Sequence, residues 1–180
     1  MDDTFRLETE RLVLRPYRQD DLDDLHTMFS DPEHMRWYPA PFDRETSQAW
    51  LERQIEGYRS RGFALWVVEE RGTGAFLGTA GPTVQVVEGT EEVEIGWHTR
   101  PGRKGEGIAP EAGAAAMDWA FANLDVEHLI SLVRPENVPS CRVAEKLVMH
   151  VDREADHKGL LHRIYRLDRV SWEPAEGGTP

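Results

Sequence analysis

Cysteine is nearly absent from this chain of 180 residues, which contains only Cys141. A single cysteine excludes an internal disulfide and a thiolate cluster around zinc, so we expect no metal and a reducing, cytoplasmic setting. The chain also lacks an apolar run long enough to span a bilayer, and its first residues carry no signal-peptide pattern. We therefore expect no membrane association.

Positive charge is scarce as well. The chain has 21 Lys and Arg residues against 33 Asp and Glu residues, which gives a net charge of −12. Nucleic acid is therefore not an expected partner, because binding a phosphate backbone needs an excess of basic side chains. The negative charge is compatible with cationic substrates, although many proteins are acidic for solubility alone.

The residues that are present predict a succession of strands and helices, because apolar side chains recur with the strand or the helix period. Predicted strands cover residues 11–15, 63–70, 75–87, 91–98, 128–134, 149–155 and 160–168, and predicted helices cover 20–30, 43–62, 112–123 and 138–147. We expect the α/β (α+β) class, with a mixed, mostly antiparallel sheet of about seven strands and helices on both faces. Residues 1–172 are expected to form a single domain, followed by a disordered tail over 173–180.

A glycine-bearing turn at residues 104–109 lies between the strand ending near His98 and the alanine-rich helix that follows. Such a turn leaves backbone N–H groups unpaired at the positive end of a helix dipole, which favours a phosphate ligand. No Ser or Thr follows a Gly-Lys pair as in a Walker loop, and Pro110 stands where a dinucleotide fingerprint needs glycine. An ordinary glycine turn before a helix would have the same sequence pattern, so other stretches of the chain are needed to distinguish it from a phosphate-binding loop.

Three stretches together resemble the GNAT superfamily of acetyl-CoA-dependent N-acetyltransferases, and in particular its ribosomal-protein N-terminal acetyltransferase branch. They are the strand Leu7–Pro16, the segment from Val93-Glu-Ile-Gly-Trp97 into Lys104–Ala112, and Asn137-Val-Pro-Ser-Cys-Arg-Val-Ala-Glu-Lys-Leu147. The resemblance runs from about Leu7 to Asp168 and implies a GNAT fold. It also implies acetyl-CoA as co-substrate, with no metal.

The resemblance implies where the donor binds. The CoA pyrophosphate would lie on the backbone of Lys104, Gly105, Glu106, Gly107, Ile108 and Ala109. Main-chain groups of Trp97, His98 and Thr99 would hold the pantetheine arm and polarise the thioester. Asn137 would contact the pantetheine arm, or it would simply cap the helix that follows.

Three positions depart from the family pattern. Lys104 stands where Gln or Arg is usual, which keeps the positive charge but loses a bidentate fork. Val148 replaces a glycine, so the turn after the last helix is expected to differ. Ala144 occupies the place of a tyrosine that protonates the leaving thiolate in many GNAT enzymes, so another group must supply that proton.

Acetyl transfer to an amine needs a base, because an alkyl ammonium has a pKa of about 10. Glu94 matches a glutamate that several GNAT enzymes place on this strand and is the first candidate, although a salt-bridged strand glutamate would look alike. Glu92 on the same face and His98 are the reserve candidates. Ser140 matches the serine that the branch is thought to use near the sulfur.

Cys141 and a group of aromatic residues are further candidates for the site. An acyl-enzyme on Cys141 is a weaker alternative, since a lone helix cysteine is usually a small buried hydrophobe. One or two of the aromatic residues Trp37, Tyr38, Phe42 and Trp66 are expected to line an acceptor pocket.

The leading hypothesis is an enzyme that moves an acetyl group from acetyl-CoA to a primary amine, by direct attack in a ternary complex. The amine would be a protein N-terminus or a small cationic molecule, entering between the loop 34–42 and the final hairpin. A homodimer is possible. The alternatives are a non-catalytic acyl-CoA-binding sensor or interaction module, and a structural domain with a degenerate site.

Overall fold

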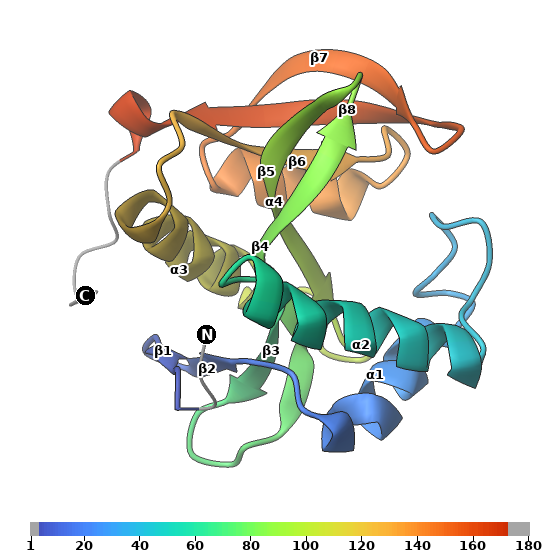
Figure 1. The fold of residues 1–180 in the computed structure, drawn as a ribbon. Helices are drawn as coiled ribbons and strands as arrows, with labels where there is room; N and C mark the ends of the chain where they lie inside the picture. The colour runs from blue at the N-terminus through green and yellow to red at the C-terminus, as the bar shows by residue number, and fades with distance from the viewer. Residues whose placement is uncertain (1–3, 173–180) are drawn as a thin grey trace.

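A computed structural model describes residues 4–172 of the chain, so the predicted tail over 173–180 lies outside the described residues. The described residues form one eight-stranded sheet with strand order β1-β2-β3-β4-β5-β6-β8-β7 (Figure 1). The expected count was about seven, and the additional strand is the two-residue β1, which pairs with β2 through Leu7 and Glu8. The strands are β1 (Leu7–Glu8), β2 (Leu12–Arg15), β3 (Trp66–Glu70), β4 (Phe76–Val87), β5 (Thr90–Thr99), β6 (His128–Val133), β7 (His150–His157) and β8 (Leu160–Asp168).

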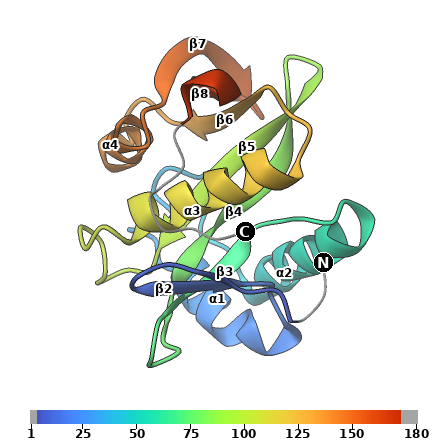
Figure 2. The ribbon, with the colours of Figure 1, turned by 90° about the vertical axis from the view of Figure 1, so that its left-hand side faces the viewer.

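The helices cover both faces of the sheet, as predicted. They are α1 (Leu22–Phe29), α2 (Arg44–Ser60), α3 (Ile108–Asn123) and α4 (Val138–Lys146), with short 3₁₀ turns at Gln19–Asp21 and Arg169–Ser171. Figure 2 shows α3 lying across β4 and β5 on one face, while α1 and α2 lie behind the sheet. None of the described helices is long and apolar enough to cross a membrane.

Small residues allow α3 to approach its neighbours closely. Ala112, Ala116 and Ala120 are completely buried. A side chain at Gly113 would collide with Leu147 at the end of α4. The largest buried side chain in the core is Trp66, which packs edge-on against Trp119 of α3 at 5.1 Å between ring centroids.

The ends of α2 and α3 follow local signals in the sequence. Asp43 caps α2 by accepting a hydrogen bond from the Thr46 N–H at 2.7 Å. Gly107 precedes α3 with φ of +81°, in the left-handed region that glycine enters without strain. These two ends confirm the predicted helix start at residue 43 and the predicted glycine turn.

The turn after α4 contradicts the expectation that replacing glycine by Val148 would change it. The Met149 N–H donates to the Ala144 carbonyl at 3.0 Å, and the Val148 N–H donates to the Glu145 carbonyl at 3.1 Å. This is the Schellman pattern, which needs a left-handed residue after the helix. Val148 takes that role with φ of +53°, so a β-branched residue is held in a conformation that favours glycine.

Candidate active site

The site begins where the sheet divides. Strands β5 and β6 are parallel and share only one register pair, Glu94 with Ile130, whereas all other strand pairs in the described sheet are antiparallel. Just beyond that pair the Ser131 hydroxyl donates to the Ile95 carbonyl at 2.7 Å. From there to its end, β5 has no partner strand on its β6 side among the described residues.

The open edge of β5 offers backbone hydrogen-bonding groups. Main-chain groups alternate between the two edges of a strand. The Ile95 carbonyl points toward β6, and the Arg100 N–H donates to Leu77 on the opposite side at 2.8 Å. By this alternation Trp97 and Thr99 direct their N–H and C=O groups into the gap, where backbone donors can polarise a carbonyl.

A cavity of about 580 Å³ lies beside this edge, against the start of α3. Its wall includes Lys104, Gly105, Gly107, Ile108 and Ala109 of the predicted phosphate loop, together with Thr99. Glu106 does not line it: its carboxylate pairs with Arg103 at 2.8 Å, and its carbonyl accepts from Arg11 at 3.0 Å. The loop therefore presents five of its six predicted residues to the cavity.

The loop is held in place by the turn that connects β1 and β2. Arg11 pairs with Glu111 in the first turn of α3 at 2.5 Å, and Thr9 donates to the same carboxylate at 2.6 Å. These contacts join residues about a hundred positions apart and fix the helix start. A side chain at Gly107 would approach the Arg11 guanidinium.

Basic side chains that the sequence did not single out surround this cavity. Arg142 and Lys146 lie one turn apart on α4, and both line the cavity and are exposed. With Lys104 they place three cations around it that have no ion pair with the described residues. Positive charge beside the start of a helix suits a polyphosphate ligand. Only the i, i+4 spacing of two basic residues could have signalled this in the sequence.

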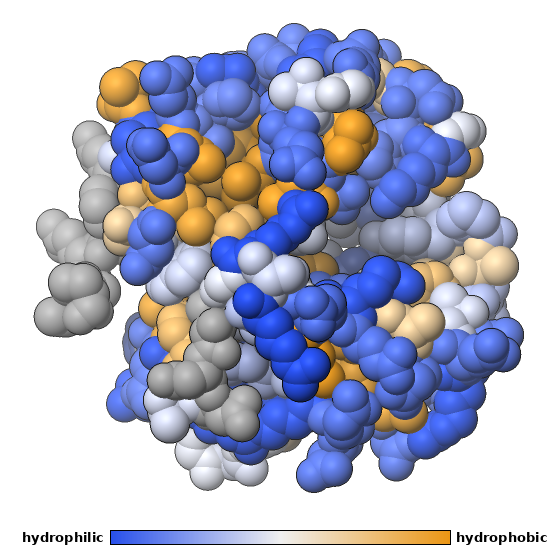
Figure 3. All heavy atoms as spheres, in the orientation of Figure 1, coloured by the Kyte–Doolittle hydropathy of each residue, from blue (hydrophilic) through white to orange (hydrophobic). Residues whose placement is uncertain are grey.

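A second cavity, of about 710 Å³, opens on the other side of β5 between α2 and the β7–β8 hairpin. Figure 3 shows the face on which the molecule is hollowed between these two halves, bordered mostly by hydrophilic side chains. Six residues line both cavities, so the two spaces meet there: Trp37, Tyr38, Trp97, His98, Asn137 and Ser140. The sequence predicted a site role for all six.

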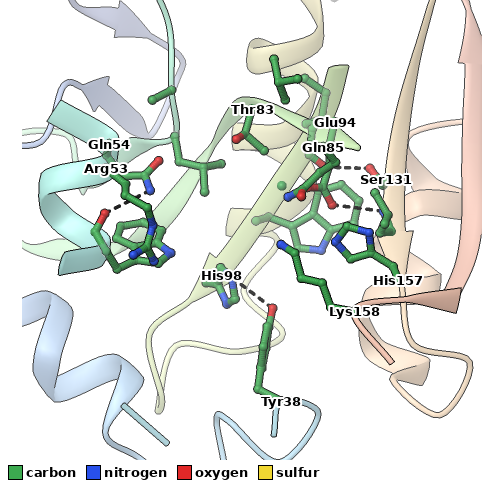
Figure 4. A pocket seen from close by; sticks show the side chains of 18 of the residues that line it. Tyr38, Arg53, Gln54, Thr83, Gln85, Glu94, His98, Ser131, His157 and Lys158 are labelled. Carbon is green, nitrogen blue, oxygen red and sulfur yellow. Dashed lines mark hydrogen bonds between the residues drawn. The ribbon is translucent and has the colours of Figure 1, made fainter. Parts of the chain in front are cut away.

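Glu94 lines only the second cavity (Figure 4). Its carboxylate accepts hydrogen bonds from the Gln85 side chain at 2.8 Å and from the Leu132 N–H at 3.1 Å. Burial raises the pKa of Glu94, and these two donors and the charge of Lys158 partly oppose the rise. A carboxylate with a raised pKa that faces a cavity is suited to accept a proton.

The reserve candidates for the base have different surroundings. Glu92 lines neither cavity, because Arg153 at 2.7 Å and His128 at 3.1 Å hold its carboxylate in ion pairs. His98 lies where the cavities meet, with its Nε2 3.3 Å from the Tyr38 hydroxyl. Burial, with the nearby His34 and Lys104, lowers the pKa of His98 to about 3, which makes it a weak base.

Of the other predicted site residues, Trp66 and Cys141 lie outside both cavities, and Asn137 lines both. Trp66 is not a pocket residue, since it is fully buried among Phe5 and Trp119 in the core. The expectation failed because tryptophan is common in cores and its sequence neighbours do not reveal the direction of its side chain. Cys141 is buried and lines neither cavity, as expected for a small hydrophobe. Asn137 caps α4 by accepting from the Ser140 N–H at 3.3 Å, and it also lines both cavities.

Comparison with known proteins defines the class. Residues 11–150 match the family model described as "Acetyltransferase (GNAT) domain". The chain is 32% identical over 149 residues to the uncharacterized protein YkkB of Bacillus subtilis, which covers 82% of this chain and 87% of that protein. It is 28% identical over 158 residues to spermidine N(1)-acetyltransferase of Escherichia coli K12, covering 85% of this chain and 80% of the enzyme.

Solved structures agree with this assignment. An acetyltransferase from Agrobacterium tumefaciens superposes with a TM-score of 0.81 at 27% identity, covering 94% of this chain and 97% of that one. A ribosomal-protein-S5-alanine acetyltransferase from Vibrio fischeri has a TM-score of 0.70 at 18% identity, with 94% of this chain and 100% of that chain covered, and so shares the fold. The chain belongs to the GNAT acetyltransferase family, whose members use acetyl-CoA. The resemblance predicted from the three sequence stretches is confirmed.

Proposed function

We propose that this acetyltransferase moves the acetyl group of acetyl-CoA to a primary amine by direct attack in a ternary complex. The observation that carries the proposal is the meeting of two cavities at the divided edge of β5. One cavity has a loop and cations suited to phosphates, and the other contains Glu94. Donor and acceptor can therefore occupy the protein together, as direct transfer requires.

The residues of the chain divide the chemistry among them. Backbone N–H groups of the 104–109 loop, with Arg142 and Lys146, hold the phosphates of CoA, which supplies the acetyl thioester. One backbone N–H group at this open edge, of Trp97 or of Thr99, holds the thioester carbonyl and stabilises the negative charge that develops on its oxygen, and the other is left for the pantetheine arm. Glu94 takes a proton from the amine, either directly or through a water molecule, so that the nitrogen can form its bond to the carbonyl carbon.

The C–S bond then breaks, and the thiolate needs a proton. Ala144 cannot supply it, but Ser140 and Tyr38 both carry hydroxyl groups and line both cavities. Burial, and then the charge of Glu94, raise the pKa of Tyr38 above that of a free phenol. A phenol nevertheless remains a better acid than a serine hydroxyl, so Tyr38 is a candidate that the sequence suggested only as a pocket wall. Comparing Ser140→Ala with Tyr38→Phe identifies the residue that protonates the thiolate, because the variant that lacks this proton donor should show the larger loss of kcat.

The proposed reaction, acetyl transfer to a nitrogen atom, requires an acceptor that is an amine. A protein N-terminus and a small cationic amine both remain within the proposal; the relative from Escherichia coli is named for spermidine, and the Vibrio fischeri neighbour for a ribosomal protein. The relatives thus support amine acetylation without selecting one acceptor.

The test is a thiol-release assay with acetyl-CoA and a panel of amines, followed by mass spectrometry of each acceptor. Acetylated product that depends on the protein supports the proposal. Calorimetry with acetyl-CoA is run in parallel. Tight binding without transfer to any amine would instead indicate the non-catalytic sensor, and neither binding nor transfer would indicate a degenerate site.

A further inference from the structure

The second cavity, of about 710 Å³, is the one proposed to hold the acceptor, and we call it the acceptor cavity. Basic residues outnumber acidic residues in its lining, whereas acidic residues predominate in the chain as a whole. Its described lining includes four Arg or Lys residues but only two carboxylates, Glu56 and Glu94. The cationic side chains are Arg53, Arg61, Arg134 and Lys158. Burial lowers the pKa of each of the three histidines in the lining, so His98, His157 and His162 add no charge at neutral pH. The net charge of −12 therefore does not describe the surface that an acceptor meets.

Two of these cations are free to bind a ligand. Arg61 is paired with Glu91 and Arg134 with Glu136, each at 3.4 Å. Arg53 and Lys158 are exposed, and neither forms an ion pair with the described residues. Unpaired cations on the wall of a cavity can each receive an anionic group without first giving up a partner.

The two free cations lie on opposite walls of the cavity. Figure 4 shows Arg53 on α2 at one side and Lys158 extending from the β7–β8 turn at the other, beside His157. Glu94 of β5 lies on the same side as Lys158, whose charge acts on its carboxylate, and across the cavity from Arg53. Each wall therefore carries a cation, and the carboxylate suited to receive the amine lies beside the wall of Lys158.

The acidic residues that cluster at positions 20–24 and 88–92 do not line this cavity. Arg15 pairs with Asp21 at 2.7 Å, and Arg44 pairs with Asp23 at 2.6 Å. Arg153 holds both Glu88 and Glu92, at 3.0 and 2.7 Å. These ion pairs offset part of the negative charge that would attract cationic substrates, while Arg53 and Lys158 on the cavity wall form no ion pair with the described residues.

We propose that the acceptor is an amine that also carries a carboxylate, as in an acidic amino acid or a peptide with an acidic residue beside its N-terminus. The inference rests on the proposed function and refines it. The amine would face Glu94, and the carboxylate would be bound by Arg53 or Lys158. A polyamine would place its additional ammonium groups against these same cations, so it should be a poor acceptor.

The test compares acceptors that differ in one group. Ala-Asp-Ala amide, Ala-Asn-Ala amide and Ala-Lys-Ala amide are measured with saturating acetyl-CoA at low ionic strength, beside free glutamate, glutamine and spermidine. We expect kcat/KM to be about tenfold higher for the aspartyl than for the asparaginyl peptide, the size of one charge-assisted hydrogen bond at a partly exposed site. The lysyl peptide and spermidine should fall below the neutral peptide. The pair of free amino acids shows whether the carboxylate is recognised outside a peptide.

Variants connect the preference to the two cations. Arg53→Gln combined with Lys158→Gln should bring the aspartyl-to-asparaginyl ratio to about one, and the corresponding double change to Glu should favour the lysyl peptide. Arg44→Gln is the matched control, because Arg44 is an exposed arginine of the same helix that does not line the cavity. It should retain the wild-type ratio. Circular dichroism and thermal melts confirm that each variant folds.

The outcomes separate this inference from the proposed function. Transfer to amines with no carboxylate preference, or with a preference for spermidine, would overturn the inference alone. A preference that survives the double Gln variant would also overturn it, because the cations would then not be its source. No transfer to any acceptor in either series would overturn the proposed function and this inference with it.

Discussion

Replacing Glu94 with glutamine tests the proposed base with little disturbance of the packing. Glutamine has nearly the same shape, and its carbonyl oxygen can still accept from the Leu132 N–H, now at 3.1 Å from the carboxylate. Gln85 can rotate its amide to keep the second contact. What the substitution removes is the ability of position 94 to take a proton.

The expected loss depends on the pKa of the acceptor. At pH 7 an alkylamine with a pKa of about 10 is neutral in about one molecule per thousand, and a peptide N-terminus with a pKa of about 8 in about one per ten. An enzyme without a base must use the neutral fraction, so kcat/KM should fall by about 10²–10³ for an alkylamine and about tenfold for a peptide. The difference in kcat/KM between Glu94→Gln and the wild type should become smaller as the pH rises toward the pKa of the amine.

The assay is the pH dependence of kcat/KM from pH 5.5 to 10 with one acceptor of each kind. Glu92→Gln is the matched control: its carboxylate belongs to the same strand but is held by Arg153 and His128 outside both cavities. This control should retain the wild-type pH profile and lose stability. The Kd of acetyl-CoA should be unchanged in Glu94→Gln, because Glu94 does not line the donor cavity.

The thermal stability of Glu94→Gln provides a second test, because this variant should lose activity but gain stability at neutral and higher pH. Burial raises the pKa of Glu94 in the folded protein. A carboxyl with a raised folded pKa stabilises the fold below its unfolded pKa and loses this contribution as the pH rises through its folded pKa. Glu94→Gln should therefore melt at a higher temperature than wild type at pH 8, with the difference closing toward about pH 4. A wild-type pH–rate profile in this variant would refute Glu94 as the base.

The remaining predictions concern the donor cavity and the turn after α4. Gly107→Val puts a β-branched residue at φ of +81° and should weaken acetyl-CoA binding at least tenfold in calorimetry, whereas unchanged affinity in a folded variant would place the phosphates elsewhere. Arg142→Gln with Lys146→Gln should raise the KM for acetyl-CoA about tenfold with little change in kcat, and an unaltered KM would remove these cations from the donor site. Val148→Gly should raise the free energy of unfolding by about 1 kcal/mol in urea melts, because relief of the left-handed strain exceeds the entropy cost of glycine. Val138→Gly, at an exposed valine in the first turn of α4, should lower it, and a loss at both valines would show that Val148 is unstrained.

The sequence determined the elements of this protein because their signals are local. The apolar period predicted the helices and all strands except the two-residue β1, which is too short to show any period. Asp43 and Gly107 marked helix starts, since a capping carboxylate and a left-handed glycine act within three or four residues of themselves. The glycine turn before α3, where we propose that the phosphates bind, was likewise readable, because one short segment supplies its backbone N–H groups.

Tertiary structure decided everything that depends on side chains from distant segments. Glu92 and Glu94 share a strand and a face, yet only the positions of Arg153 and His128 direct the first into ion pairs and leave the second in the cavity. Trp66 was directed into the core by the packing of α3. The pair of cations that we propose to bind the acceptor, Arg53 and Lys158, joins α2 to the β7–β8 turn, which are about a hundred residues apart. Composition could not reveal it, because a net charge sums over the chain while a ligand responds to the charges that the fold brings to its surface.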